Sequence, residues 1–303
     1  MKFQYGINTN KIDITDIVNE KCLKDNTIYI PKNDVVRRDL FNIDPCPNIV
    51  KFVYINGCKF DKNIEIKIDI TKKICICFFG LTRSLKYTHP SINEHILKIL
   101  ILNNYYFDIY LHTYNLDKLT NNRSNEKNIK LDFNEYKLLN PDYFLIDNQS
   151  EFDKKINIDN YSLKGDPWND KKASLFNLIR QLNSLKEVTN MHSNKEYNCY
   201  IYLRPDLKYL NNLNINIIKN LQKNTFYTPI WGKYGGLNDR LGLGDKNTML
   251  KFGFRFNEAQ EYAKNKKLHS ETFLNHVMIN YKKVNINLKA NRIRANGNIK
   301  KDC

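Results

Sequence analysis

Residues 198 to 210 constrain the fold more than any other stretch of this chain. They read NCYIYLRPDLKYL, a run of β-formers that stops abruptly at Arg204, Pro205 and Asp206. Pro205 cannot continue a central ladder, and it biases Arg204 towards an extended conformation. The pattern therefore predicts a buried strand that delivers a cation and a carboxylate to its carboxyl end, where open α/β sheets bind their ligands. A strand followed by a surface ion pair fits these residues equally well.

The residues upstream predict an α/β arrangement. ICICFFG at 74–80 is a continuous apolar run, and Ser91 with Glu94 three residues later forms the capping box of a following helix. FDIYLHTY at 107–114 supplies the next strand, so the segment reads as a βαβ unit with a right-handed crossover. The same reasoning predicts strands at 142–146, 225–230 and 284–288, and helices at 175–185 and from Ser270, which would cap its helix. Residues 71–303 are therefore expected to form one α/β domain, a Rossmann-like mixed sheet flanked by helices.

Residues 1–70 have a different character. Short strand-like pieces, TIYIP, IVKFVYI and IEIKIDI, are separated by prolines and by Gly57. We expect a small β-rich module there, with Arg37 and Arg38 as ordinary surface charge. Residues 115–141 are Asn-rich and charged, which indicates a long surface excursion with some helix.

The net charge of +16 calls for an anionic partner. Asn, Lys, Ile and Tyr are all frequent, however, as expected of an AT-rich coding sequence, so the lysine excess is weak evidence. No compact basic block interleaved with aromatics is present, and no nucleic-acid-binding motif is recognisable. Nucleic acid is therefore not the expected partner.

Two further properties bear on location. No apolar run approaches the roughly 20 residues that span a bilayer, and the N-terminus lacks the pattern of a signal peptide, so a cytoplasmic protein without a transmembrane anchor is expected. The seven cysteines are odd in number and mostly lie in apolar, strand-like contexts, which favours reduced core residues. Cys75 and Cys77 would share one face of a strand, but two thiols alone make a poor zinc site.

Five of the eleven glycines fall between residues 231 and 244. Such clustering permits close backbone approach. Asn238, Asp239 and Arg240 form a polar triplet in the middle of this stretch, and Trp231 with nearby leucines favours a packed functional loop over a flexible linker.

Other candidate ligand-binding residues follow the predicted strands and helices. Arg83, in the turn after Gly80, could reach a phosphate or a ribose. Arg292 and Arg294 share one face of an extended segment and could clamp a diphosphate, although a basic tail explains them as well. Only Gly80 is present where a dinucleotide-binding protein would have three glycines, so a dehydrogenase is disfavoured.

Two residues have a plain alternative. His112 is best explained as a hydrogen-bonded histidine at the end of a strand. Arg180 and its neighbour Asn177 could face a ligand from their helix or be ordinary solvated residues.

The order of these motifs resembles a group of GT-A-type glycosyltransferases found in surface-glycan and capsule clusters and in large DNA viruses. The resemblance covers residues 73–297 and rests on the succession FFGLTRS, YLHTY, YLRPDL, GGLNDRLGLG, HSETFL and RIRANG. It implies a GT-A-like domain that moves a sugar from a nucleotide sugar, expected to be a nucleoside diphosphate sugar, to a hydroxyl of a glycan acceptor. The donor is expected to contact Thr82, Arg83, Arg180, Arg204, Asp206, Asn238, Arg292 and Arg294.

The resemblance also places Arg204 and Asp206 where GT-A enzymes carry Asp-x-Asp, with Asp206 matching the last position and Arg204 replacing the first. Asp206 would then hold Mn²⁺ or Mg²⁺ together with water and diphosphate. Alternatively, Arg204 supplies the positive charge and no metal is needed. An inverting enzyme needs a base for the acceptor hydroxyl, and Glu271 and Asp239 are the candidates, with Glu271 slightly preferred. In a retaining enzyme both would bind sugar.

Three other functions compete with this one. A non-catalytic relative would bind nucleotide sugars or glycans without turnover. A basic nucleic-acid-binding protein would show strongly salt-dependent association. A nucleotidyltransferase would normally bring a glycine-rich phosphate loop, which is missing after Gly80.

Overall fold

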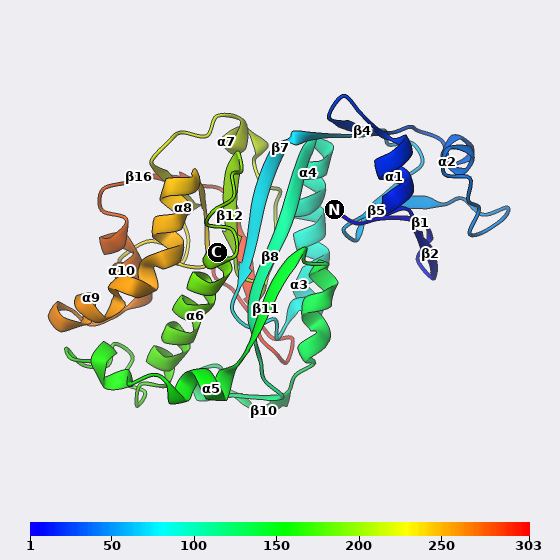
Figure 1. Cartoon of the computed structure of the whole chain (residues 1–303). Helices are drawn as coiled ribbons and strands as arrows, with labels where there is room; N and C mark the ends of the chain where they lie inside the picture. Colours follow the sequence, from blue (N-terminus) through cyan, green and yellow to red (C-terminus); the bar gives the residue numbers. More distant parts are fainter.

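A computed structural model describes the backbone of residues 1–303 and every side chain except that of Asn122. It shows a central mixed sheet with helices on both faces, and a small antiparallel sheet at the N-terminal end (Figure 1). The predicted fold class, an α/β protein with a mixed sheet flanked by helices and a small β-rich N-terminal part, is confirmed.

The central sheet has the order β11-β8-β7-β12-β15-β14-β16, and β4 and β3 extend it beyond the start of β7. Strands β11, β8, β7 and β12 are parallel, whereas β15 is antiparallel to both of its neighbours. The carboxyl ends of β8, β7 and β12 therefore meet at one edge. The strands are β3 (Leu23–Lys24), β4 (Thr27–Ile30), β7 (Ile66–Phe79), β8 (Tyr105–Asn115), β11 (Tyr143–Asn148), β12 (Cys199–Leu203), β14 (Thr225–Pro229), β15 (Leu241–Gly244) and β16 (Lys282–Ile286).

Alternation along β7 builds two cores. Ile74 and Ile76 point to one face, and Cys75 and Cys77 point to the other. Because both faces are covered by helices, the strand is apolar on both sides, as the ICICFFG run predicts. The first face is covered by α3 (Leu85–Ile92), η1 (Asn93–Leu97) and α4 (Lys98–Leu102), and the second by α6 (Ala173–Asn190), α8 (Lys246–Gly253), η5 (Phe254–Glu258), α9 (Ala259–Asn265) and α10 (Ser270–Val277) (Figure 1).

The helix after β7 begins six residues earlier than the sequence predicts. Helix α3 starts at Leu85, so the expected capping box at Ser91 is wrong. Ser91 lies inside the helix, where its hydroxyl donates to the Thr88 carbonyl (2.7 Å) and accepts from the Tyr209 amide (3.0 Å). Its side chain is thus already used to join α3 to the strand after β12.

The N-terminal part forms its own antiparallel sheet, β2-β1-β5-β6, with two short helices beside it. It is joined to the central sheet by β4, which pairs with the first residues of β7. The segments read as IEIKIDI and ICICFFG therefore belong to one strand of 14 residues that crosses residue 70. The elements are β1 (Phe3–Ile7), β2 (Asn10–Asp13), α1 (Thr15–Lys21), α2 (Asp34–Phe41), β5 (Phe52–Ile55) and β6 (Cys58–Phe60). The division at residue 70 stays a proposal.

Arg37 is not surface charge, contrary to the prediction. Its side chain is fully buried and donates to the carbonyl oxygens of Pro31 (2.8 Å), Asp61 (3.1 Å) and Ile64 (2.5 Å). Arg38 is at the surface as predicted, with 43% of its side chain exposed. A buried structural cation and a solvated one thus stand next to each other in the sequence.

The excursion at 115–141 contains the expected short helix, η3 (Phe133–Leu139), and also a hairpin that was not predicted. Glu126, in its second strand, is fully buried. The hairpin is β9 (Lys118–Asn121), η2 (Asn122–Ser124) and β10 (Glu126–Lys130), and the remaining elements are α5 (Gln149–Lys154), η4 (Ile158–Tyr161), β13 (Leu207–Tyr209), α7 (Ile215–Lys219), β17 (Ala290–Ile293) and β18 (Ile299–Lys300).

The end of the glycine-rich stretch is a strand rather than a loop. LGLG forms β15 in the interior of the central sheet. A Cβ on Gly242 would lie 2.5 Å from the Phe226 ring, so glycine is required there by close packing and not by backbone freedom.

No helix in the described part of the chain has the length and apolarity needed to cross a bilayer. The cysteines lie in apolar surroundings as predicted, with Cys303 the exposed exception. The thiols of Cys75 and Cys77 share one face of β7, 3.5 Å apart.

Candidate functional site

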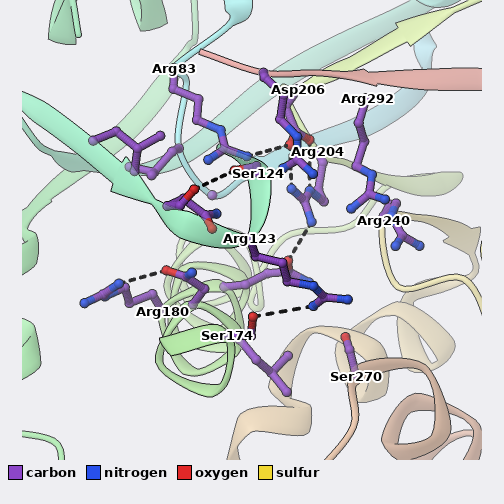
Figure 2. Close-up of a pocket in the computed structure, with 18 of the residues that line it drawn as sticks. Arg83, Arg123, Ser124, Ser174, Arg180, Arg204, Asp206, Arg240, Ser270 and Arg292 are labelled. Atoms are coloured by element: carbon purple, nitrogen blue, oxygen red, sulfur yellow. Dashed lines mark hydrogen bonds and ion pairs between the residues drawn. The ribbon is translucent and has the colours of Figure 1, made fainter. Parts of the chain in front are cut away.

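A cavity of about 550 Å³ opens at the edge where β7, β8 and β12 end. Its size is typical of a small-molecule site. The wall is formed by the segments that follow these strands, by the β9–β10 hairpin, by α6 and α10, and by the chain after β17 (Figure 2). Among the described residues, the wall carries nine cationic side chains, Arg83, Lys118, Arg123, Arg180, Arg204, Arg240, Arg292, Arg294 and Lys300, and three carboxylates, Asp206, Asp239 and Glu271.

Helix α6 fixes the ends of two strands through Ser184. The Gly80 amide donates to the Ser184 hydroxyl (2.7 Å), and that hydroxyl donates to the His112 carbonyl (2.9 Å). His112 is fully buried, with Nδ1 2.8 Å from Ser184 Oγ and Nε2 3.1 Å from Asp147. The expectation of a hydrogen-bonded histidine at the strand end is confirmed.

The two charges after β12 bind each other. Arg204 donates through Nε to Asp206 Oδ1 (2.9 Å) and through Nη2 to Oδ2 (2.5 Å). Burial would raise the pKa of Asp206, but Arg204 and the nearby Arg83 lower the pKa to about 2. Asp206 is therefore an ionised carboxylate at any physiological pH.

Asp239 is held by three neighbours. Its Oδ2 accepts from Gln181 Nε2 (2.8 Å) and from the Ser270 hydroxyl, and its Oδ1 lies 3.3 Å from Arg240 Nη1. Burial would raise the pKa of Asp239, but Arg240, Arg204 and these hydrogen bonds bring the pKa far below the ordinary value. A carboxylate of such low basicity is a weak proton acceptor.

Glu271 differs from Asp239 although the two lie close together. Its Oε1 accepts from Arg240 Nη2 (3.2 Å), and its Oε2 lies 3.6 Å from His269 Nδ1. Burial and repulsion by Asp239 raise the pKa of Glu271 to about 7, despite the attraction of Arg240. A carboxylate in the first turn of a helix is normally stabilised by the helix dipole, and here burial outweighs that effect. Its pKa is close to the value that suits a general base near neutral pH.

The start of α10 departs from the prediction in one more respect. Ser270 was expected to cap the helix, but His269 is the capping residue and makes no side-chain cap bond. The Ser270 hydroxyl is turned instead to Asp239. The first turn of α10 thus contributes both Ser270 and Glu271 to the site.

The glycine-rich loop packs directly on the backbone of Glu271. The Leu237 amide donates to the Glu271 carbonyl (3.1 Å). A Cβ on Gly236 would lie 1.9 Å from that same oxygen, so glycine is needed there for the loop to approach the helix.

A short sheet, β13-β17-β18, brings the terminal arginines to the cavity. The Ile293 amide donates to the Asp206 carbonyl (2.8 Å), which ties the segment to the end of β12. Arg292 donates to both carboxylate oxygens of Asp302, from Nε (2.6 Å) and Nη2 (2.7 Å). Figure 2 shows the guanidinium groups of Arg204, Arg240 and Arg292 directed towards the same part of the cavity.

Most of the predicted site residues lie on this wall. The structure brings together eight of them, Arg83, Arg180, Arg204, Asp206, Asp239, Glu271, Arg292 and Arg294. Thr82 lies outside the wall, and its carbonyl accepts from the Leu85 amide (3.1 Å) in the turn before α3. Asn238 also lies outside it and supports the loop, because its side chain donates to the Trp231 carbonyl (2.8 Å) and accepts from the Arg240 amide (2.9 Å).

Arg180 is on the wall but is already paired. Its Nε and Nη2 donate to the two carboxylate oxygens of Asp153, at 2.8 and 2.7 Å, and its Nη1 donates to Asn177 (2.8 Å).

Several wall residues were missed from the sequence. Gln181 joins Arg204 (2.9 Å) to Asp239 (2.8 Å), and the β9–β10 hairpin supplies Lys118 and Arg123. Gln181 and Ser184, with Asn177, form a polar stripe at helical spacing on α6, which was a usable signal. The hairpin gave no such signal, because its residues are as polar as those of a solvated loop.

Asp206, the expected metal ligand, is bonded to an arginine. Both carboxylate oxygens of Asp206 are bound to Arg204, and the other two carboxylates of the wall, Asp239 and Glu271, are both paired with Arg240. Mn²⁺ and Mg²⁺ need several oxygen ligands, and a guanidinium group stands beside each carboxylate here. These side chains do not fit a divalent metal site.

One other cluster in the described part of the chain has metal-like spacing. The ligand atoms of Cys75, Cys77 and His192 lie within 4.8 Å of one another. All three residues are fully buried in the core on the α6 face of the sheet, and none of them lines the cavity.

The fold and the cavity define an α/β protein with a strongly cationic cavity at the carboxyl edge of its sheet. The chain belongs to the family described as a domain of unknown function (DUF7796), which it matches over residues 69–292. No curated protein matches it by sequence. Among solved structures it is similar to the crystal structure of mouse xyloside xylosyltransferase 1 in its apo form. That similarity has 11% sequence identity over 71% of this chain and 85% of the other, with a TM-score of 0.36, which does not assign an activity.

Proposed function

We propose that this protein is a glycosyltransferase that moves a sugar from a nucleoside diphosphate sugar to a hydroxyl of a glycan acceptor. The observation that carries the proposal is a single cavity that joins an arginine-rich wall to a buried carboxylate of raised pKa, Glu271. The order of sequence motifs, which resembles GT-A-type glycosyltransferases, supports the same conclusion.

The cationic wall suits the donor. Nine cationic side chains face three carboxylates, so the empty cavity is strongly positive and favours an anionic ligand. Arginine matches phosphate groups with paired N–H donors. The carboxyl edge of the parallel strands is also where α/β sheets commonly bind nucleotides.

Glu271 is the better candidate for the base. In an inverting transfer, its carboxylate would take the proton of the acceptor hydroxyl while that oxygen bonds to the anomeric carbon. The bond from this carbon to the diphosphate oxygen would break, with its electron pair leaving on the diphosphate. A base must be deprotonated and still basic near neutral pH, and the pKa of about 7 meets this condition. Asp239, whose pKa is strongly lowered, would instead orient Ser270 and Gln181 or contact the sugar.

A panel of UDP-, GDP-, dTDP- and CMP-sugars tests the proposal. We expect one nucleotide class to raise the melting temperature and to be cleaved slowly by water or, faster, in the presence of glycan acceptors. Glu271→Gln should keep the donor-induced shift and lower turnover by about 10² to 10⁴. Arg38→Gln, at the surface of the N-terminal part, is the matched control.

Two results would contradict the proposal. Binding without turnover, unchanged in Glu271→Gln, would indicate a non-catalytic nucleotide-sugar or glycan-binding protein. If no nucleotide sugar binds and a salt-sensitive complex with DNA or RNA forms instead, the protein would belong to the nucleic-acid-binding class. The sugar, the acceptor, the setting in a capsule cluster or virus and the cytoplasmic location stay predictions from the sequence.

A further inference from the structure

Two arginines of the cavity wall have guanidinium groups that no described residue satisfies by hydrogen bonding. Arg83 is nearly enclosed, with 9% of its side chain exposed, and its closest acidic atoms are Asp206 Oδ2 at 3.6 Å and Glu126 Oε2 at 3.8 Å. Both distances exceed that of a hydrogen bond. Glu126 is itself bound to the Ala295 amide (2.7 Å) and to Ser124.

Arg294 is more isolated still. It lies half-buried on the wall, and within the described residues its side chain has neither a hydrogen bond nor an ion pair. Burial and the neighbouring cations Arg83 and Arg292 lower the pKa of Arg294. A cation so placed costs free energy unless an anion joins it.

Three neighbouring arginines of the wall already have acidic partners. Arg204 is bound to Asp206, Arg292 to Asp302 and Arg240 to Glu271. Among the arginines of the wall, Arg83 and Arg294 are the two without any hydrogen bond to a described residue, and their charges influence each other. Each guanidinium offers five N–H donors in a planar fork that matches phosphate oxygens.

We propose that Arg83 and Arg294 bind the diphosphate of the donor directly, beside Arg292, and that no divalent cation takes part. The inference rests on the proposed function and specifies how its leaving group is held. The guanidinium groups would stabilise the negative charge that develops on the diphosphate as its bond to the sugar breaks. Asp206 then acts as a positioning residue, which holds Arg204 rather than a metal.

Calorimetric titration with inorganic pyrophosphate tests the subsite alone, without any assumption about base or sugar. Titrations in EDTA and in Mn²⁺ should give affinities within about twofold of each other. Inorganic phosphate should bind at least about tenfold more weakly, because it offers only one of the two groups.

Variants locate the binding. Arg294→Gln and Arg83→Gln should each weaken pyrophosphate at least about tenfold, and Arg294→Lys should recover only part of the affinity. Arg38→Gln should have no effect. Melting temperatures establish that each variant is folded.

Asp206→Asn separates the two ways of holding a diphosphate. If a metal bound to Asp206 held the diphosphate, removing this carboxylate would lower the affinity for pyrophosphate. The arginine site should keep its affinity or gain about twofold, because a negative charge beside Arg83 is removed. If this variant does not fold, the EDTA comparison and the Arg294 variants still decide.

The inference is overturned if Mn²⁺ strengthens pyrophosphate binding about tenfold or more, if Arg294→Gln binds as the wild type does, if phosphate and pyrophosphate bind equally, or if neither binds up to about 5 mM. Its failure is distinct from failure of the proposed function. Mn²⁺-dependent turnover of a nucleotide sugar would support the proposed function and contradict the inference. Metal-free pyrophosphate binding through Arg294, with no turnover of any donor, would do the reverse.

Discussion

Buried cations are treated in opposite ways in the N-terminal part and in the cavity. Arg37 is enclosed and donates hydrogen bonds to three carbonyl oxygens, and Lys51, 4% exposed, lies between Asp34 (3.4 Å) and Asp44 (2.8 Å). Arg83 and Arg294, on the cavity wall, have no hydrogen-bond partner among the described residues. Buried basic side chains thus have hydrogen-bond partners in the N-terminal part, whereas Arg83 and Arg294 lack them on the cavity wall.

The difference shows what each region is for. A buried cation that donates a hydrogen bond from each of its nitrogens fixes local structure, and removing it leaves its acceptors unpaired. A cation without partners lowers the stability of the empty protein and gains its partner only when a ligand arrives. Stability and binding should therefore respond in opposite directions when the two kinds of arginine are replaced.

The largest effect is expected on the saturated side. Arg37→Met keeps most of the apolar volume but leaves three carbonyl oxygens without donors, so the free energy of unfolding should fall by at least about 3 kcal/mol. Urea denaturation measures the loss. Pyrophosphate affinity of the folded variant should be unchanged. The free energy of unfolding of the adjacent, exposed variant Arg38→Met should lie within about 0.5 kcal/mol of the wild-type value. Equal losses at both positions would show that the buried hydrogen bonds of Arg37 do not stabilise the fold.

The next effect concerns Glu271 and depends on pH. Its pKa in the folded protein, about 7, exceeds the ordinary value of 4.5, so the folded state prefers the protonated form. The stability this group contributes is complete below about pH 4.5 and is lost as pH rises through about 7. At pH 8, Glu271→Gln should exceed the wild type in stability by up to about 3 kcal/mol.

That gain should disappear when both proteins are unfolded in urea at pH 4, where Glu271 is protonated. Turnover should follow the opposite course and rise through about pH 7 as the base ionises. A stability difference that does not change with pH would show that the Glu271 carboxyl titrates normally.

A smaller effect is expected at the contact between the glycine-rich loop and α10. Gly236→Ala places a methyl group 1.9 Å from the Glu271 carbonyl oxygen, so the loop must move and the Leu237 hydrogen bond must break. We expect a stability loss of about 2 kcal/mol and a larger loss in turnover than in donor affinity. Gly235→Ala is the neighbouring variant without this crowding, because its Cβ would meet only the Thr272 methyl group at 3.8 Å, but its φ of +82° adds a strain of about 1 kcal/mol of its own. Normal turnover in Gly236→Ala would show that the contact between the glycine-rich loop and α10 is not needed for Glu271 to act as a base.

The smallest effect on stability is expected at Arg294. Arg294→Gln should leave stability unchanged or raise it by up to about 1 kcal/mol, because a half-buried charge beside Arg83 and Arg292 is removed. Denaturation without ligand provides the measurement. A clear loss of stability would mean that Arg294 serves the fold.

The sequence predicted the parts of the site in which chemistry and secondary structure coincide. Arg204 and Asp206 follow a run of β-formers, so their place at the end of a strand followed from the sequence pattern. Glu271 was named as a site residue through the resemblance to glycosyltransferases. The glycines near Asp239 indicated close packing for the right reason, since Gly236 does touch Glu271.

The features that were not predicted from the sequence depend on contacts between residues far apart in the chain. Arg37 looks like any surface arginine until residues 61 and 64 bring their carbonyls to it. The β9–β10 hairpin has one apolar pair, Leu119 and Ile129, among polar residues, which is too little alternation to identify two strands. LGLG reads as a loop because glycine weakens a strand, and only the presence of Phe226 opposite makes glycine necessary there.

Strand β7 also has a consequence for how the molecule opens. Its 14 residues extend about 46 Å, from the pairing with β4 at one end to the cavity wall at Phe79 at the other. Cleavage at residue 70 would cut inside this strand, at the irregularity between Asp69 and Lys73, instead of in a linker. Amide protons of β4 and of the cavity end of β7 are therefore expected to exchange with solvent in one cooperative event, so that loosening the N-terminal sheet also loosens the edge where the ligand binds.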